Sequence, residues 1–95
     1  MWLRRSRLGS LFGPLELRVL EAVWRRGREA SVRDLLPDFP GTAYTTLMTT
    51  ADRLYRKGVL VREKRGRAFV YRARYDREQL ECGTVMRALA ALLRA

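Results

Sequence analysis

The stretch TAYTTLMTTADRLYRKG, residues 42–58, decides which fold the sequence predicts. Its apolar residues recur at helical spacing and predict a helix from about Ala43 to Lys57, which Gly58 ends. We expect one face of this helix to be buried against the rest of the protein. That apolar stripe consists of Tyr44, Leu47, Met48, Ala51, Leu54 and Tyr55.

The other side of this helix is polar and basic, and it contains four threonines. Because β-branched residues lose rotamer freedom in a helix, something other than helix stability favours threonine here. Threonine can offer hydroxyls to base edges or phosphates and a methyl to thymine, and arginine and lysine reach phosphates or guanine. We expect Thr46 and Arg53 to lie at or next to bases. The candidate nucleic-acid contacts are Thr45, Thr46, Thr49, Thr50, Arg53 and Lys57, with Arg56 beside them.

Two further helices are predicted before this segment. The first, residues 14–26, begins at a proline, which suits the first helical turn, and is ended by Gly27. Ser31 is a good N-cap for a short second helix, residues 32–36, which Pro37 interrupts before a turn.

Two strand-like runs, residues 59–65 and 67–75, follow the same segment. The tight connection at Gly66 predicts that they form a β-hairpin. Positive charge gathers here, since nine basic residues lie from Arg53 to Arg74. The hairpin tip supplies further candidate contacts that should mostly add charge, namely Lys64, Arg65 and Arg67.

A last helix is predicted to begin at Asp76, because Gln79 stands three residues later in a loose capping box. A second apolar stripe at helical spacing starts at Cys82, which we expect to be a small buried residue. An apolar face on so short a domain favours association of two copies. The expected dimer interface consists of Val85, Met86, Leu89, Leu92 and Leu93.

Three helices followed by a hairpin have the element order of a winged helix-turn-helix. The predicted fold is therefore α+β, mainly α, with a hairpin wing and one C-terminal helix. We expect a basic N-terminal arm at residues 1–13, a winged-helix domain at 14–75 and a dimerisation helix at 76–95. The arm is either a frayed terminus or a source of phosphate contacts through Trp2, Arg4, Arg5 and Arg7.

The composition narrows the range of partners. The 95 residues suffice for one core, and 20 Lys and Arg against 10 Asp and Glu give a net charge of +10. We therefore expect a polyanionic partner, with nucleic acid ahead of an anionic membrane. The absence of histidine and the single cysteine exclude a disulfide framework, a multi-cysteine zinc site and a histidine acid/base pair. We expect no enzyme, cofactor, metal or small-molecule substrate, and a cytoplasmic protein without a signal segment or membrane span.

A specific resemblance strengthens this interpretation. Residues 43–54, AYTTLMTTADRL, followed by Lys57-Gly58 and by REKRGRAFVY at 62–71, resemble the penicillinase-repressor (BlaI/MecI/CopY) family. LELRVL at 15–20 and Trp24 are also similar to the first helix of that family.

The resemblance implies a homodimeric winged-helix repressor that binds a palindromic operator in double-stranded DNA. It implies that the threonine face and Arg53 read the major groove, and that Arg65 and Arg67 belong to the wing. Only one helix follows the wing, so the sequence gives no basis for the proteolytic induction known in this family. The single Cys82 does not match the paired cysteines of copper-responsive members. An interaction module that binds RNA or an acidic protein surface remains the alternative function.

Overall fold

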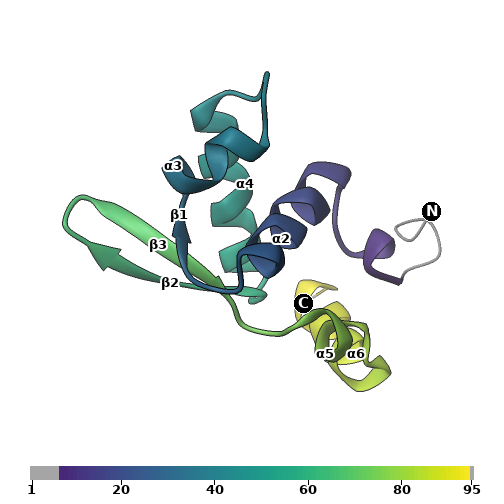
Figure 1. The fold of residues 1–95 in the computed structure, drawn as a ribbon. Coiled ribbons are helices and arrows are strands. Elements are labelled where there is room, and N and C mark those ends of the chain that lie inside the picture. Colours follow the sequence, from purple (N-terminus) through teal and green to yellow (C-terminus); the bar gives the residue numbers. More distant parts are fainter. Residues whose placement is uncertain (1–6, 95) are drawn as a thin grey trace.

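A computed structural model describes residues 7–94, and Figure 1 shows a hairpin projecting from a group of helices. The order of elements confirms the predicted winged helix, mainly helical with three helices before the hairpin. In chain order the elements are η1 (Arg7–Ser10), α2 (Pro14–Arg26), β1 (Ala30–Ser31), α3 (Val32–Leu35), η2 (Leu36–Asp38), α4 (Tyr44–Arg56), β2 (Leu60–Arg65), β3 (Ala68–Ala73), α5 (Arg77–Glu81) and α6 (Gly83–Arg94).

Helix α2 has the bounds that the sequence predicts. The backbone N–H of Gly13 donates to Glu16 Oε1 over 2.8 Å, which caps the helix ahead of Pro14. At the other end Gly27 adopts a left-handed φ of 67°, and its N–H donates to the carbonyls of Val23 and Trp24. Both ends of the helix are therefore fixed by local chemistry.

Helix α3 begins at the predicted N-cap, Ser31. The Ser31 hydroxyl accepts from the backbone N–H of Asp34, and the Asp34 carboxylate accepts from the backbone N–H of Ser31. Hydrogen bonds from the Ser31 backbone and side chain lower the pKa of Asp34. The α-helix ends one residue earlier than predicted, because the chain around Pro37 tightens into the 3₁₀ turn η2.

The hairpin of β2 and β3 is the wing. The strands pair antiparallel from Leu60 opposite Ala73 to Arg65 opposite Ala68. At its tip Gly66 has a φ of 62°, and no described residue other than glycine has a positive φ, which is the pattern of a two-residue type II′ turn. A third strand that the sequence did not predict, β1, pairs with β3 and gives the sheet order β1-β3-β2.

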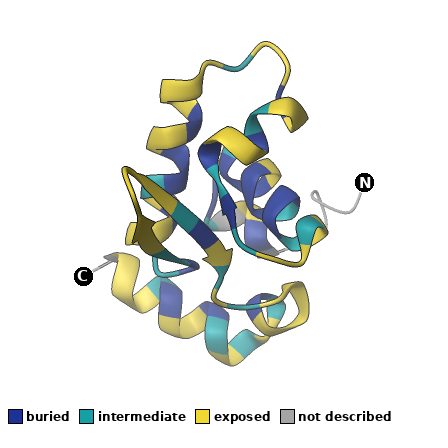
Figure 2. Cartoon of the chain, turned by 60° about the vertical axis from the view of Figure 1, so that its left-hand side comes forward, coloured by how far each residue is buried: buried dark blue, intermediate teal, exposed yellow. Residues whose placement is uncertain are grey.

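The core begins before α2. Leu8 and Phe12 are buried among residues of the other helices, as the inward-facing dark blue segments of Figure 2 illustrate for the fold as a whole. Burial of these apolar side chains holds this part to the domain, and the basic arm over residues 1–13 stays a prediction. Residues 1–6, including Trp2, Arg4 and Arg5, lie outside the described residues.

The C-terminal region consists of two helices where the sequence predicts one. The predicted capping box of Asp76 and Gln79 is present and starts α5. Cys82 has an extended backbone with ψ of 131°, which separates α5 from α6. Cys82 is exposed, so the prediction that it is buried is wrong. A hydrogen bond from the backbone N–H of Thr84, followed by that of Val85, lowers the pKa of the Cys82 thiol.

Candidate nucleic-acid interface

Helix α4 presents a polar outer face. Thr45, Thr49 and Arg56 follow one another at i, i+4 and i+11, and all three are exposed. Leu47, Ala51 and Leu54 lie on the opposite side and are buried.

The predicted apolar stripe of α4 is only half correct. Met48 is 45% exposed, and Tyr44 and Tyr55 are each 39% exposed. The buried sector is rotated toward Thr50, which is 5% exposed, because α4 packs against α2, α3 and β2 and leaves this apolar flank open. Met48 and Tyr44 thus join the exposed surface of α4, and no sequence signal separates them from the buried residues.

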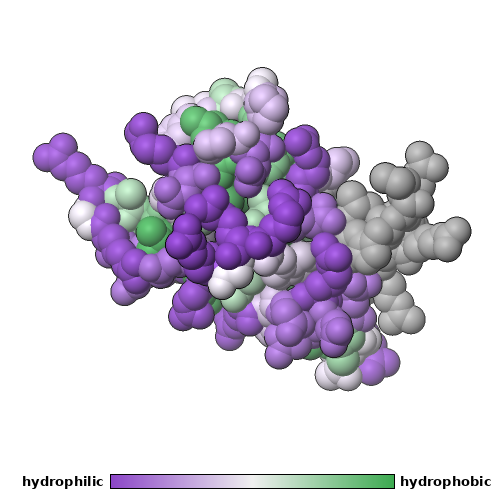
Figure 3. Space-filling model, viewed as in Figure 1, coloured by the Kyte–Doolittle hydropathy of each residue, from purple (hydrophilic) through white to green (hydrophobic). Residues whose placement is uncertain are grey.

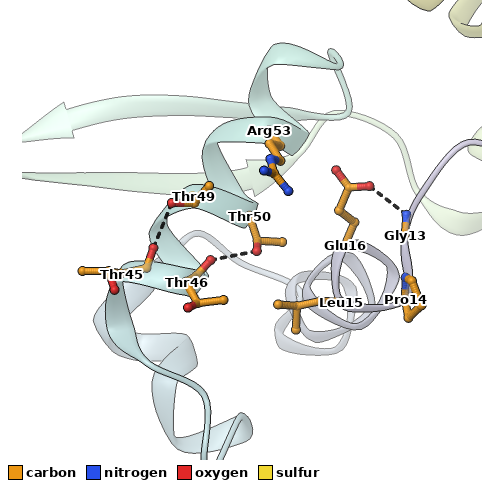
Figure 4. A pocket seen from close by; sticks show the side chains of 9 residues that line it. All are labelled: Gly13, Pro14, Leu15, Glu16, Thr45, Thr46, Thr49, Thr50 and Arg53. Atoms are coloured by element: carbon orange, nitrogen blue, oxygen red, sulfur yellow. Dashed lines mark hydrogen bonds between the residues drawn. The ribbon is translucent and has the colours of Figure 1, made fainter.

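The threonines have different roles. The Thr50 hydroxyl donates to the Thr46 carbonyl over 2.8 Å, and the Thr49 hydroxyl donates to the Thr45 carbonyl over 3.0 Å (Figure 4). This bonding back to the preceding turn explains how the helix tolerates the threonines. Thr50 is buried and internally bonded, so the structure does not place it with the exposed contacts. Thr49 stays exposed, and its oxygen can still accept a hydrogen bond.

A groove separates α4 from the start of α2. It has a volume of about 480 Å³, and the side chains of Arg53 and Glu16 point into it from opposite sides (Figure 4). Arg53 is exposed and has no ion-pair partner among residues 7–94. The groove is lined by Gly13, Pro14, Leu15, Glu16, Thr45, Thr46, Thr49, Thr50 and Arg53.

Lys57 serves the fold rather than the open face. Its Nζ lies 2.8 Å from Glu16 Oε1, donates to the Leu11 carbonyl over 2.9 Å and lies 5.1 Å from the ring centroid of Phe12. These contacts bind the end of α4 to the start of α2. The charge of Lys57 already has a partly buried acidic partner, and its role as a nucleic-acid contact stays a prediction.

The basic residues at the tip of the wing, Lys64, Arg65 and Arg67, differ in whether they form ion pairs. Arg65 is paired with Glu29 and, over 3.1 Å, with Glu63. The hydrogen bond from Arg65 to Glu29, and then that to Glu63, raise the pKa of Arg65. Lys64 and Arg67 are exposed, and neither has an acidic partner within the described part of the chain. In Figure 3 the projecting wing is mostly hydrophilic.

An acidic residue also lies on this side of α4. Asp52 pairs with Arg56 one turn later and with Arg62 of β2. The i, i+4 spacing of Asp52 and Arg56 is a sequence signal for their ion pair. No sequence signal indicates that Asp52 also pairs with Arg62 of the wing.

Some residues of the expected dimer interface are buried in their own chain and others are exposed. Met86 and Leu89 are buried in the core of their own chain, and Val85 packs against that core. Leu92 is 71% exposed and Leu93 is 40% exposed. Only the end of the predicted stripe is thus open, because its first turns cover the domain itself.

Other site classes find no support in the described part of the chain. Within residues 7–94 no group of three or more Cys, Asp or Glu side chains is placed to hold a metal ion. Over the same residues, each helix is too short or too polar to cross a membrane.

The three helices, the polar outer face of α4 and the basic hairpin together define a winged helix-turn-helix protein. The chain matches the penicillinase repressor family over residues 12–95 and belongs to that family. The family is described as that of the penicillinase repressor, and one of the relatives below is a transcriptional regulator.

Two known proteins are similar in sequence to most of this chain. The transcriptional regulator BlaI of Mycobacterium tuberculosis is 33% identical over 81 residues, which cover 82% of this chain and 59% of the regulator. An uncharacterized protein of Pyrococcus horikoshii is 37% identical over 76 residues, which cover 76% of this chain and 23% of that protein. The chain thus spans less than two thirds of either relative. The crystal structure of Mycobacterium tuberculosis Rv0081 shares the fold, with a TM-score of 0.57 at 24% identity over 92% of this chain and 78% of that one.

Proposed function

We propose that the chain represses transcription by binding double-stranded DNA in a sequence-specific manner, as a dimer on a palindromic operator. The observation that carries the proposal is the exposed outer face of α4 with Arg53, together with Lys64 and Arg67 of the wing, which have no acidic partner among residues 7–94. A helix of this width fits the major groove, and a wing beside it meets the adjacent backbone or minor groove.

The residues of α4 differ in what they can recognise. Thr45, Thr46 and Thr49 present hydroxyl oxygens or methyl groups from an exposed face, and Arg53 supplies a planar donor that suits guanine or phosphate. The exposed Met48 adds an apolar contact of the kind that thymine methyl groups accept. In this proposal sequence preference resides in α4.

The wing residues supply charge more than sequence reading. Within the described part of the chain Lys64 and Arg67 have no acidic partner, and Arg65 contributes less because it is already paired with Glu29 and Glu63. Replacing Arg67 should weaken binding to all duplexes about equally, whereas replacing Thr46 should change sequence preference.

The dimer is proposed from the open end of α6. Leu92 and Leu93 are exposed apolar residues on one helix, and burying them against a second copy removes them from water. A two-fold pair of winged helices places its recognition helices about one turn of DNA apart, roughly 34–36 Å, and so matches an inverted repeat.

Selection of bound sequences from a random duplex library tests this function. Near-physiological salt suppresses unspecific binding by a chain of charge +10. The expected result is an enriched inverted repeat that structured RNA does not displace at equal concentration. Binding that shows no enrichment and vanishes as salt rises would contradict the proposal, and preferential loss to the RNA competitor would favour an RNA-binding module.

A further inference from the structure

The carboxylate of Asp52 is at odds with the charge of the surface around it. Asp52 lies on α4 directly before Arg53 and one turn before Arg56, and both of these arginines are exposed. A negative charge there should repel a DNA backbone. Both carboxylate oxygens are engaged, with Oδ2 lying 3.0 Å from Arg56 Nε and Oδ1 lying 2.9 Å from Arg62 Nη1.

Arg62 joins α4 to the wing through more than this ion pair. Its Cζ lies 4.0 Å from the ring centroid of Tyr55, in α4, and 4.1 Å from that of Phe69, in β3. A guanidinium stacks on aromatic faces in a way that a lysine ammonium does not reproduce. In the sheet Arg62 pairs with Tyr71, so Phe69 is its diagonal neighbour on the same face.

These contacts stand at the base of a projecting hairpin. Beyond Arg62 the residues from Glu63 to Phe69 are all exposed. A two-stranded hairpin is marginally stable on its own. Strand β1 supports β3 at Val70 and Tyr71, and beyond these pairs the exposed ion pair of Arg65 with Glu29 adds little, so the direction of the hairpin depends largely on what holds its base. The burial of Arg62 alone would lower its pKa, but hydrogen bonds to Tyr71 and Asp52 outweigh this and raise the pKa. The group therefore keeps its charge while packed between α4 and the wing.

We propose that Asp52 and Arg62, with the rings of Tyr55 and Phe69, form a strut that holds the wing at a fixed position relative to α4. Asp52 and Arg62 are then positioning residues for DNA binding. The strut lets α4 and the wing tip reach one duplex together without ordering the wing at the moment of binding. The role of the strut in DNA binding rests on the proposed function.

The purely electrostatic alternative makes the opposite prediction for one substitution. If Asp52 only adds unwanted charge, Asp52→Asn should tighten DNA binding, because the chain gains one positive charge. If Asp52 belongs to the strut, Asp52→Asn should weaken binding to the selected duplex by about threefold or more. Equal or tighter binding would overturn the strut.

A measurement without DNA separates the strut from the proposed function. Backbone ¹⁵N relaxation reports the order of the Gly66 amide at the wing tip in the wild-type chain, in Arg62→Met and in Arg62→Lys. Methionine keeps an apolar stem but loses the ion pair and stacking, whereas lysine keeps the charge. We expect the Gly66 order parameter to fall from about 0.8 to below about 0.6 in Arg62→Met, and to fall also in Arg62→Lys.

Arg72→Met is the matched control. Arg72 is an exposed wing arginine on the other sheet face, opposite Val61, so this change removes the same charge without touching the strut. Its Gly66 order parameter should equal that of the wild type. An unchanged value in Arg62→Met, or an equal drop in Arg72→Met, would refute the strut. Should Arg62→Met not fold, Phe69→Leu repeats the test from the half-exposed side of the strut.

A DNA-binding measurement tests whether the wing still contributes to affinity when the strut is broken. Arg67→Ala should weaken binding severalfold in the wild-type background and by less than about twofold in the Arg62→Met background, because a loose wing gains little from its contacts. The same severalfold loss in both backgrounds would contradict the strut. A wild-type chain that binds no duplex would remove the proposed function, and the Gly66 relaxation would still decide the strut.

Discussion

Replacing Lys57 with methionine is expected to destabilise the fold and to leave DNA recognition intact. Lys57 Nζ makes two hydrogen bonds, to the Leu11 carbonyl and to Glu16 Oε1, and the two side chains of the ion pair are only 25% and 10% exposed. Methionine retains the apolar stem and removes all donors. Among residues 7–94 Glu16 then keeps the backbone N–H of Gly13 as its one hydrogen-bond partner.

The size of the effect follows from these contacts. A hydrogen bond to a charged group contributes about 1.5–3 kcal/mol, and this pair keeps some contact with solvent, so we expect a loss of about 2 kcal/mol. For a domain of this size that lowers Tm by roughly 10 °C. Adding Glu16→Gln should recover part of the loss, because the double variant leaves no unpaired carboxylate while the amide oxygen still accepts from Gly13.

The assay pairs thermal unfolding with the salt dependence of DNA binding, and Lys64→Met serves as the control. Lys64 is exposed, so its replacement should leave Tm almost unchanged and reduce the salt slope of binding by about one. Lys57→Met should lower Tm and leave the slope unchanged. A stable Lys57→Met chain with a reduced slope would refute this reasoning and return Lys57 to the DNA contacts.

Three further predictions concern the capping, the cysteine and the dimer. Ser31→Ala should lower the free energy of unfolding by about 1 kcal/mol in urea denaturation and leave duplex affinity unchanged, and a loss of affinity without a loss of stability would contradict its capping role. Because the hydrogen bond from the Thr84 backbone lowers the Cys82 pKa, iodoacetamide should reach its half-maximal rate at a lower pH in the native chain than in the urea-unfolded chain; the reverse order would count against this contact. Leu92→Asp should convert a micromolar dimer into a folded monomer in sedimentation velocity, and a wild-type monomer with and without DNA would remove the dimer proposal.

Much of the fold could be predicted from local chemistry. Helix α2, the Ser31 cap and the Gly66 turn each depend on residues within one or two turns of the chain, and the structure has all three. The strand β1 has two residues and therefore no periodicity to detect. Its place in the sheet depends on pairing with Tyr71 and Val70, far along the chain.

The candidate site was harder to predict, because side-chain pairing is not local. Lys57 and Glu16 are 41 residues apart, and Arg65 and Glu29 are 36 residues apart, so the sequence could not show that two basic residues are already engaged. Helical periodicity indicates that α4 has a buried side, but packing against α2, α3 and β2 decides which flank it includes.

Amide chemical shifts of the ¹⁵N-labelled chain, followed as the selected duplex is added, show whether α4 and the wing form the DNA-binding surface. We expect the largest changes at Thr45, Thr49 and Arg53 on α4 and at Lys64 and Arg67 on the wing, with small changes in α5. Changes concentrated in α5 and α6, with α4 and the wing unaffected, would contradict this expectation.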